Sequence, residues 1–293
     1  MHIPDGILSA PILGGFGLAS SLGVLISAKR AESSTQPHRL PLLGVLGAFV
    51  FAAQMVNFPV GPGASGHLLG GALLAASIGP WAASITMTAI LILQALLFQD
   101  GGVLALAANV FNMAFLGVWA AWLPFRSLSN KSLGLFLGAF LSVLLSALFA
   151  LAEVSFSSGV LTRGLWLFCL ALFTITGLIE ATITLAAWQA IERLAGRSTT
   201  NPKPLRYALL SLSVVILFTG VFFASSAPDV LEYFQHQSGI APSSAPFPSL
   251  MPDYEWALFD LNWLRKSAAS LAGLLAVFGL SVLISRFVPR GQQ

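Results

Sequence analysis

The sequence predicts an all-α integral membrane protein, a helical bundle of about nine transmembrane spans. Of its 293 residues, 56% are hydrophobic and only 9% are charged, and the mean hydropathy is +0.85. A soluble domain carries about 25% charged residues, so this chain has too little polar surface to cover a water-soluble globule of its size. Most of its surface is therefore predicted to face lipid.

Apolar stretches that approach the roughly 20 residues of a membrane-spanning helix recur along the whole chain. The third of them is short and follows the Pro/Gly-rich segment PVGPG at 59–63. Irregular backbone is tolerated at membrane depth only where protein buries it, so this loop is a candidate for a position inside the bundle. The predicted spans are 9–28, 40–57, 66–79, 81–98, 102–124, 133–152, 163–191, 205–225 and 267–286.

The lysines and arginines predict the orientation of these spans, because cytoplasmic loops carry an excess of basic residues. Nine spans place the two termini on opposite sides of the membrane. With the N-terminus outside and the C-terminus inside, only Arg163, Arg265 and Lys266 of the fourteen basic residues fall on outer connectors. The basic residues therefore favour an external N-terminus.

A polar segment at 197–204, RSTTNPKP, divides the chain into two predicted parts. Residues 1–198 form a main membrane domain of about seven spans, and residues 199–293 form a two-span C-terminal appendix with an extracytoplasmic loop at about 226–264. This loop holds five of the eleven acidic residues. A solvated loop explains that composition, and a cation-attracting surface or a lid over the outer opening is the alternative.

Composition and missing motifs argue against several classes of function. The formal charge of +3 is scattered over connectors, which argues against a nucleic-acid-binding surface. The lone Cys169 excludes an intramolecular disulfide framework, and the first residues carry Asp5 and no basic residue, so no cleavable signal peptide is expected. The chain has neither a G-x-x-x-x-G-K-[ST] phosphate loop nor an H-E-x-x-H zinc motif. Any ATP hydrolysis by the phosphate-loop route must therefore come from another protein.

The first two residues carry the nitrogen atoms of a metal chelate. The Met1 amine, the His2 amide nitrogen and the His2 imidazole can reach one ion together, closing a five-membered and a six-membered ring. Amide deprotonation at neutral pH needs a strongly binding ion such as Ni²⁺ or Cu²⁺, and these ions also favour square-planar nitrogen ligation. Pro4, Asp5 and Gly6 supply turn chemistry that folds this segment back. The alternative interpretation of His2 is an exposed terminus without a role.

The fourth position of a planar site needs one more donor, and His67 in the segment SGHLLGG at 65–71 is the natural candidate. An ionisable residue at membrane depth is by default a functional-site hypothesis, and neutral imidazole is the commonest metal ligand. Gly66 and Gly70 let neighbouring backbone approach closely. The alternative interpretation is a histidine that only packs or forms hydrogen bonds.

These segments together resemble the CbiM/NikM family, the S components of nickel and cobalt energy-coupling-factor transporters. The resemblance covers roughly residues 1–195 in order. Residues 199–293 resemble a fused form of the small accessory N subunit, although Val230 in PDVLE at 228–232 replaces a glycine of that motif. The matching segments are MHIPDGILS at 1–9, FAAQMVNFPV at 51–60, GASGHLLGG at 63–71, QALLFQDGG at 94–102 and NVFNM at 109–113.

The resemblance implies that Met1, His2 and His67 bind Ni²⁺ or Co²⁺ as cargo, with no resident cofactor. It also implies a transmembrane coupling (T) subunit and cytoplasmic ATPase subunits as partners, and a multi-pass location in the cell (inner) membrane. The chain itself is then a transport component and not an enzyme.

Three further polar residues are candidates for supporting roles. Glu180 lies in the middle of a predicted span, where it could orient a ligand or make an internal helix contact. Gln54 and Asn57 precede the histidine segment and could hold the His67 ring in one tautomer.

Two other functions stay open at this point. One is a permease that works without ATPase partners, which inverted repeats would favour. The other is a membrane enzyme that uses a bound metal for hydrolysis, for which Glu180 is the only candidate base.

Overall fold

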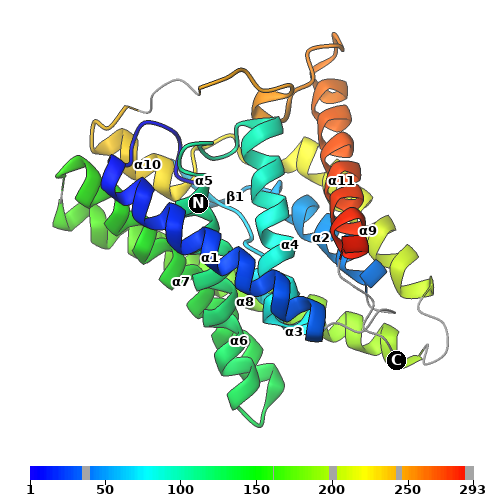
Figure 1. The fold of residues 1–293 in the computed structure, drawn as a ribbon. Helices are drawn as coiled ribbons and strands as arrows, with labels where there is room; N and C mark the ends of the chain where they lie inside the picture. The colour runs from blue at the N-terminus through cyan, green and yellow to red at the C-terminus, as the bar shows by residue number, and fades with distance from the viewer. Residues whose placement is uncertain (35–39, 161, 198–202, 242–245, 288–293) are drawn as a thin grey trace.

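The computed structural model describes residues 1–34, 40–160, 162–197, 203–241 and 246–287, and it is a bundle of helices (Figure 1). The long elements run roughly alongside one another, and the chain returns repeatedly between the two ends of the bundle. They are α1 (Ala10–Ser34), α2 (Leu40–Gln54), α4 (Pro80–Leu93), α7 (Lys131–Ser158), α8 (Arg163–Arg197), α9 (Lys203–Phe223) and α11 (Asn262–Phe287).

Shorter elements connect these helices. One helix changes type along its length, from α5 (Leu106–Asn109) through the π-helical η3 (Val110–Gly117) to α6 (Val118–Ser127), and α4 similarly continues into the π-helical η2 (Gln94–Phe98). The remaining elements are α3 (Gly71–Ile78), α10 (Val230–Gln237), the 3₁₀ turn η4 (Pro252–Tyr254) and the strands β1 (Phe58–Gly61) and β2 (Ala64–Gly66).

Six helices within the described residues are long and apolar enough to cross a membrane, so the chain is a multi-pass membrane protein. A shorter apolar helix covers Leu42–Gln54, and α11 contains the predicted span 267–286. The number of nine spans and their orientation stay predictions. The six are Ala10–Ala31, Pro80–Phe98, Leu106–Ser127, Lys131–Ser158, Arg163–Leu194 and Leu205–Phe223.

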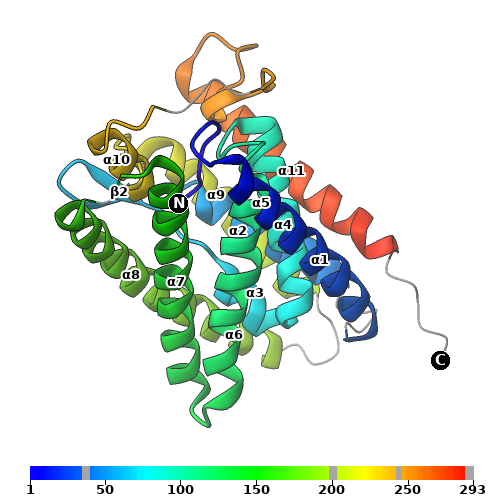
Figure 2. The same cartoon turned by 60° about the vertical axis from the view of Figure 1, so that its left-hand side comes forward.

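The C-terminal helices pack on the rest of the bundle. Helix α11 contacts α2, α4 and α9, while α7 contacts both α6 and α8. Figure 2 shows α6 and α7 as a long hairpin on one side, with α11 on the other side. Helix α10 lies against α8, α7 and β2, so part of the predicted outer loop at 226–264 folds onto the main membrane domain.

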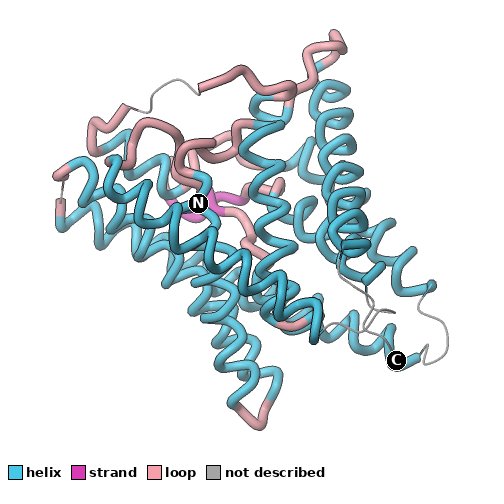
Figure 3. The backbone as a smooth tube through the Cα atoms, viewed as in Figure 1, coloured by secondary structure: helices cyan, strands magenta, loops and turns pink. Residues whose placement is uncertain are grey.

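The Pro/Gly-rich segment forms a small antiparallel hairpin that lies among the helices (Figure 3). Phe58 pairs with Gly66 and Pro59 with Ser65, and all three residues of β2 are buried. The turn contains Gly63 with a φ of 73°, a conformation that favours glycine. Irregular backbone thus enters the bundle where protein covers it, as expected from the sequence.

The third predicted span, 66–79, differs from the structure. Its helix, α3, begins only at Gly71 and has eight residues, or about 12 Å, too short to cross a hydrocarbon core of about 30 Å. Gly70 has a φ of 73°, and a side chain at that position would collide with Val50. The backbone N–H groups of Leu69 and Gly70 donate to the Glu180 carboxylate, at 2.9 and 3.0 Å. These tertiary contacts keep residues 67–70 out of a helix.

Glu180 on α8 therefore makes an internal contact that fixes the histidine segment. We expect Glu180→Ala to lower the stability by about 3 kcal/mol, because two buried N–H groups lose their acceptor. Thermal unfolding in detergent, followed by tryptophan fluorescence, measures this change. Glu192→Ala, an exposed acidic position on the same helix, is the matched control. Equal unfolding temperatures for the two variants would contradict the assigned role.

Candidate metal centre

The first five residues fold back into the bundle and are held there by polar contacts. The buried Asp5 carboxylate accepts hydrogen bonds from the backbone N–H groups of Val103, Leu104 and Ala105, at 3.0, 2.7 and 3.3 Å. Asn109 brackets Ile3, because its side chain accepts from the Ile3 N–H at 2.8 Å and donates to the Ile3 carbonyl at 3.0 Å. Residues 3–5 are therefore fixed by groups about a hundred positions away: the Asn109 side chain and the backbone N–H groups of residues 103–105.

Met1 and His2 are consequently buried, with exposed fractions of 4% and 8%. Gly6, with a φ of 80°, makes the predicted turn that leads from this segment into α1. Figure 1 shows the amino terminus within the bundle near β1, and not at an outer tip.

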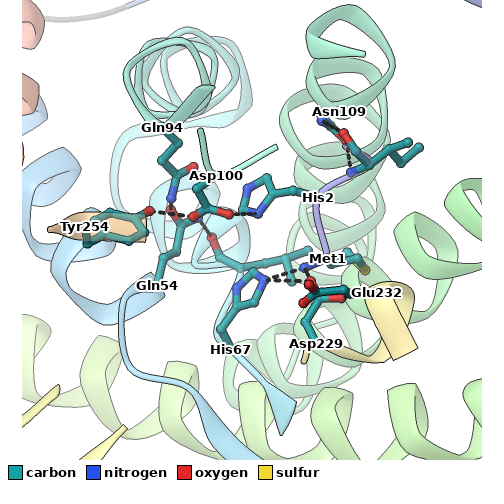
Figure 4. Close-up of polar contacts among 12 residues, drawn as sticks. Met1, His2, Gln54, His67, Gln94, Asp100, Asn109, Asp229, Glu232 and Tyr254 are labelled. Atoms are coloured by element: carbon teal, nitrogen blue, oxygen red, sulfur yellow. Dashed lines mark hydrogen bonds and ion pairs between the residues drawn. The ribbon is translucent and has the colours of Figure 1, made fainter. Parts of the chain in front are cut away.

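The histidine segment presents His67 to the amino terminus. The Met1 nitrogen lies 2.5 Å from His67 Nε2, and His67 Nδ1 lies 3.0 Å from the Leu68 carbonyl. A ring nitrogen that faces a carbonyl carries the proton, which leaves the lone pair of Nε2 directed at Met1. The His2 and His67 rings are nearly parallel, at 4°, with centroids 5.4 Å apart. Structure and sequence thus agree that Met1, His2 and His67 lie together (Figure 4).

The His2 ring is turned differently from the predicted chelate. Its Nδ1 lies 2.9 Å from Asp100 Oδ1, and its buried Nε2 has no hydrogen-bond partner among the described residues. A six-membered chelate ring with the His2 amide nitrogen would use Nδ1. Binding in that mode therefore requires the ring to leave Asp100 by rotating about its Cβ–Cγ bond.

Two carboxylates that the sequence analysis did not assign to the site contact its donor groups. Asp229, at the start of α10, forms an ion pair with the Met1 amine. Asp100 contacts His2 and also accepts a hydrogen bond of 2.5 Å from the Tyr254 hydroxyl. Tyr254 stacks on Phe98, with ring centroids 4.5 Å apart. Both acidic residues occur in segments of the resemblance, QALLFQDGG and PDVLE, and this was the only signal in the sequence that could have indicated them.

The electrostatics of the site follow from these contacts. Burial, together with the nearby amino-terminal charge, lowers the pKa of His67 to about 3, so its imidazole is neutral. His67 lies in the loop before α3, outside the six long helices. Burial raises the pKa of Asp229, but the charge of the Met1 amine and the hydrogen bonds that the carboxylate accepts lower it by more, so the net pKa is below the ordinary value. Burial also opposes ionisation of Asp100, and its contacts with His2 and Tyr254 outweigh this and lower its pKa. Both carboxylates are therefore ionised at neutral pH.

Gln54 and Asn57 do not hold the His67 ring, which corrects the expectation for them. The Gln54 side chain donates to the Leu69 carbonyl at 2.7 Å and accepts from Gln94 at 3.0 Å. The backbone carbonyl of Asn57 accepts from the Ser225 N–H at 2.8 Å. The contact to His67 Nδ1 comes instead from the neighbouring Leu68 carbonyl, because the irregular backbone turns that carbonyl toward the ring.

A cavity of about 700 Å³ leads to this cluster of donors. It is lined by the buried His2 and His67 and by the partly exposed Asp100 and Asp229. Glu232, His236 and Asp253 line it at exposed positions, so the donors are accessible from the side of α10 and η4. The site combines nitrogen donors, one of them a neutral imidazole, with two carboxylates. These are groups that bind divalent transition-metal ions.

Comparisons with known proteins identify relatives over nearly the full length of the chain that are named as nickel transport proteins. The chain is 31% identical to the putative fused nickel transport protein NikMN of Archaeoglobus fulgidus, over 98% of this chain and 99% of that protein. It is also 31% identical to the probable fused nickel transport protein LarMN of Lactiplantibacillus plantarum, over 96% and 97%.

The fold has a solved relative as well, described as the crystal structure of a transition metal transporter. The TM-score is 0.59 at 32% identity, and the match covers 67% of this chain and 94% of that one. The model of the CbiM family, described as the cobalt uptake substrate-specific transmembrane region, matches residues 2–197. The chain therefore belongs to the CbiM family.

Proposed function

We propose that this protein captures Ni²⁺ or Co²⁺ from outside the cell as the substrate-binding component of an ATP-driven importer. The observation that carries the proposal is the burial of the Met1 amine against the His67 imidazole, with the His2 ring beside them. Metal–nitrogen bonds of about 2 Å at right angles separate two neighbouring ligand atoms by about 2.8 Å. The separation of 2.5 Å between the Met1 nitrogen and His67 Nε2 is close to that value.

The ion is the cargo of the protein. In the proposed site the Met1 amine, the His2 amide nitrogen, the His2 imidazole and the His67 imidazole are the four ligands. Planar nitrogen ligation favours Ni²⁺ over Co²⁺, and the two full-length relatives are named as nickel transport proteins. Cobalt is the alternative cargo, because it is the ion in the description of the family.

The energy for import comes from partner proteins in this proposal. The sequence has no phosphate-loop motif, so cytoplasmic ATPase subunits would hydrolyse ATP. A transmembrane coupling (T) subunit would transmit the resulting conformational change to this chain. Metal uptake by the chain expressed without partners would favour the permease alternative instead.

A hydrolytic enzyme is less well supported, because its candidate base is occupied elsewhere. The Glu180 carboxylate accepts from the backbone N–H groups of Leu69 and Gly70 and from the Thr184 hydroxyl, at 3.3 Å for the last. It supports the histidine segment, and both of its oxygens accept hydrogen bonds there.

Extending the chain before Met1 tests the chelate directly. Two added residues, glycine and serine, convert the Met1 amine into an amide. They also do not fit in the buried space around the Met1 nitrogen. Since disturbing even the outer partners of a metal ligand costs about 10- to 100-fold in affinity, we expect a loss of at least about 100-fold. Calorimetry with Ni²⁺ measures it, and the same two residues added at the C-terminus are the control. Unchanged affinity in the extended chain would refute the proposed ligand set.

His67→Ala should abolish uptake of nickel in metal-limited cells that also express the partner subunits, because one equatorial ligand is lost. His236→Ala is the matched control, since His236 is 62% exposed and contacts none of the four donors. Normal uptake by His67→Ala, at an equal amount of protein in the membrane, would remove His67 from the site.

Proton release distinguishes an amide ligand from ordinary coordination. Ni²⁺ displaces one proton from the Met1 ammonium group and one from the His2 amide nitrogen, so we expect about two protons released per ion near pH 7. Calorimetric titrations in buffers with different ionisation enthalpies give this number. A value of one or less would show that the amide nitrogen keeps its proton.

A further inference from the structure

The Met1 amine has a partner from the C-terminal part of the chain. Its ion pair with Asp229 is shielded from solvent, with side-chain exposures of 3% and 18%. The same carboxylate lies 4.0 Å from His67 Nε2. A buried charge without a counter-charge is strongly destabilising, and Asp229 supplies that counter-charge to the amino terminus. Asp229 lies beyond residues 2–197, which the family model matches.

The fold fixes the Asp229 carboxylate independently of Met1. Asp229 is the N-cap of α10, where its Oδ1 accepts from the Glu232 N–H at 2.8 Å. The following residues Val230 and Leu231 are buried, with exposed fractions of 1% and 0%. The position of the carboxylate is therefore set by the helix and its packing, and does not depend on the amino terminus.

The segment before α10 is also tied to the strand that leads to His67. The Ser65 N–H donates to the Pro228 carbonyl at 2.8 Å, and the Ser65 hydroxyl donates to the Ala227 carbonyl at 2.7 Å. Ser65 precedes His67 by two positions. Hydrogen bonds thus join the two segments that carry His67 and Asp229. The Met1 amine lies between these two side chains (Figure 4).

One carboxylate can balance the positive charge around the Met1 amine both without and with the bound metal ion. Without metal, the ammonium group carries one positive charge. With metal, a divalent ion and a deprotonated amide nitrogen also sum to one positive charge. Asp229 neutralises that charge before and after binding. The other carboxylate, Asp100, is engaged by His2 and Tyr254 before binding and keeps Tyr254 as its partner once the His2 ring has turned toward the metal.

We propose that Asp229 is a positioning residue of the metal site, which holds the Met1 amine at His67 before the ion arrives and remains as its counter-charge afterwards. This proposal rests on the metal-capture function proposed above. It makes the C-terminal region a structural part of the site, so that residues 1–198 alone leave the amino terminus without its ionic partner.

Asp229→Asn in the full-length protein with a native amino terminus tests the proposal. Asparagine is as good an N-cap as aspartate, so the substitution removes the charge and keeps the start of α10. Glu232→Gln is the matched control, because it removes an equal charge from the same helix and cavity without touching Met1.

Three measurements are made on each variant in detergent. An amine-reactive ester labels the Met1 amine of the metal-free protein, and the labelling rate is read by mass spectrometry of the amino-terminal peptide. Stopped-flow absorption gives the rate of Ni²⁺ association, and the ligand-field spectrum of the loaded protein reports the ligand set.

We expect Asp229→Asn to be labelled about tenfold faster and to bind Ni²⁺ about tenfold more slowly, the factor that corresponds to one lost charged hydrogen bond. The spectrum of its loaded site should equal that of the wild type, because the four ligands are unchanged. A merely structural defect of the site would change the spectrum as well. Asp229→Glu, which restores the charge, should recover part of both rates.

Wild-type labelling and association rates in Asp229→Asn would overturn the proposal, and so would equal changes in Glu232→Gln, which would assign the effect to the total charge of the cavity. The extended amino terminus separates this failure from that of the function itself. If extension abolishes Ni²⁺ binding while Asp229→Asn behaves as wild type, the chelate stands and only the role of Asp229 fails.

Discussion

A charged amino group buried among apolar helices is costly unless an opposite charge and hydrogen-bonding groups surround it. Met1 satisfies this requirement through His67 and Asp229, and the next residues are held by Asp5 and Asn109. His67 comes from the loop that follows the β hairpin, Asp229 from the N-terminus of α10, and Asn109 from α5. One end of the bundle is in this sense arranged around the first five residues of the chain.

The proposed metal ligands are preorganised, because buried backbone groups near them also have partners. Glu180 and Gln54 satisfy the backbone of residues 69 and 70, so the irregular segment before α3 has a defined conformation without metal. A site whose donors are already in place loses less conformational entropy when the ligand binds. The exception is the His2 ring, which Asp100 holds in an orientation that the proposed chelate must change.

Composition and apolar periodicity were sufficient to predict a helical membrane protein and the approximate positions of its long helices, because lipid imposes strong constraints on sequence. The proximity of the first two residues to His67 was also predicted, since a terminal amine next to a histidine has distinctive chemistry, and the binding of a metal by these groups stays a proposal. The length of α3 was not, because it depends on the contact of residues 69 and 70 with Glu180, 111 and 110 positions away. Asp229 and Asp100 were missed for the same reason: an acidic residue in a polar loop acquires its role only from the tertiary neighbour that it meets.

The ion pair between Met1 and Asp229 joins residues that are 228 positions apart. A ribosome adds about 5 to 20 residues per second, so the first residue waits roughly 10 to 45 s before its carboxylate partner has been synthesised. During this interval the earlier helices enter the membrane while the amino group lacks its counter-charge. The ion pair of the amino terminus can therefore form only late in biogenesis, after most of the chain has been translated.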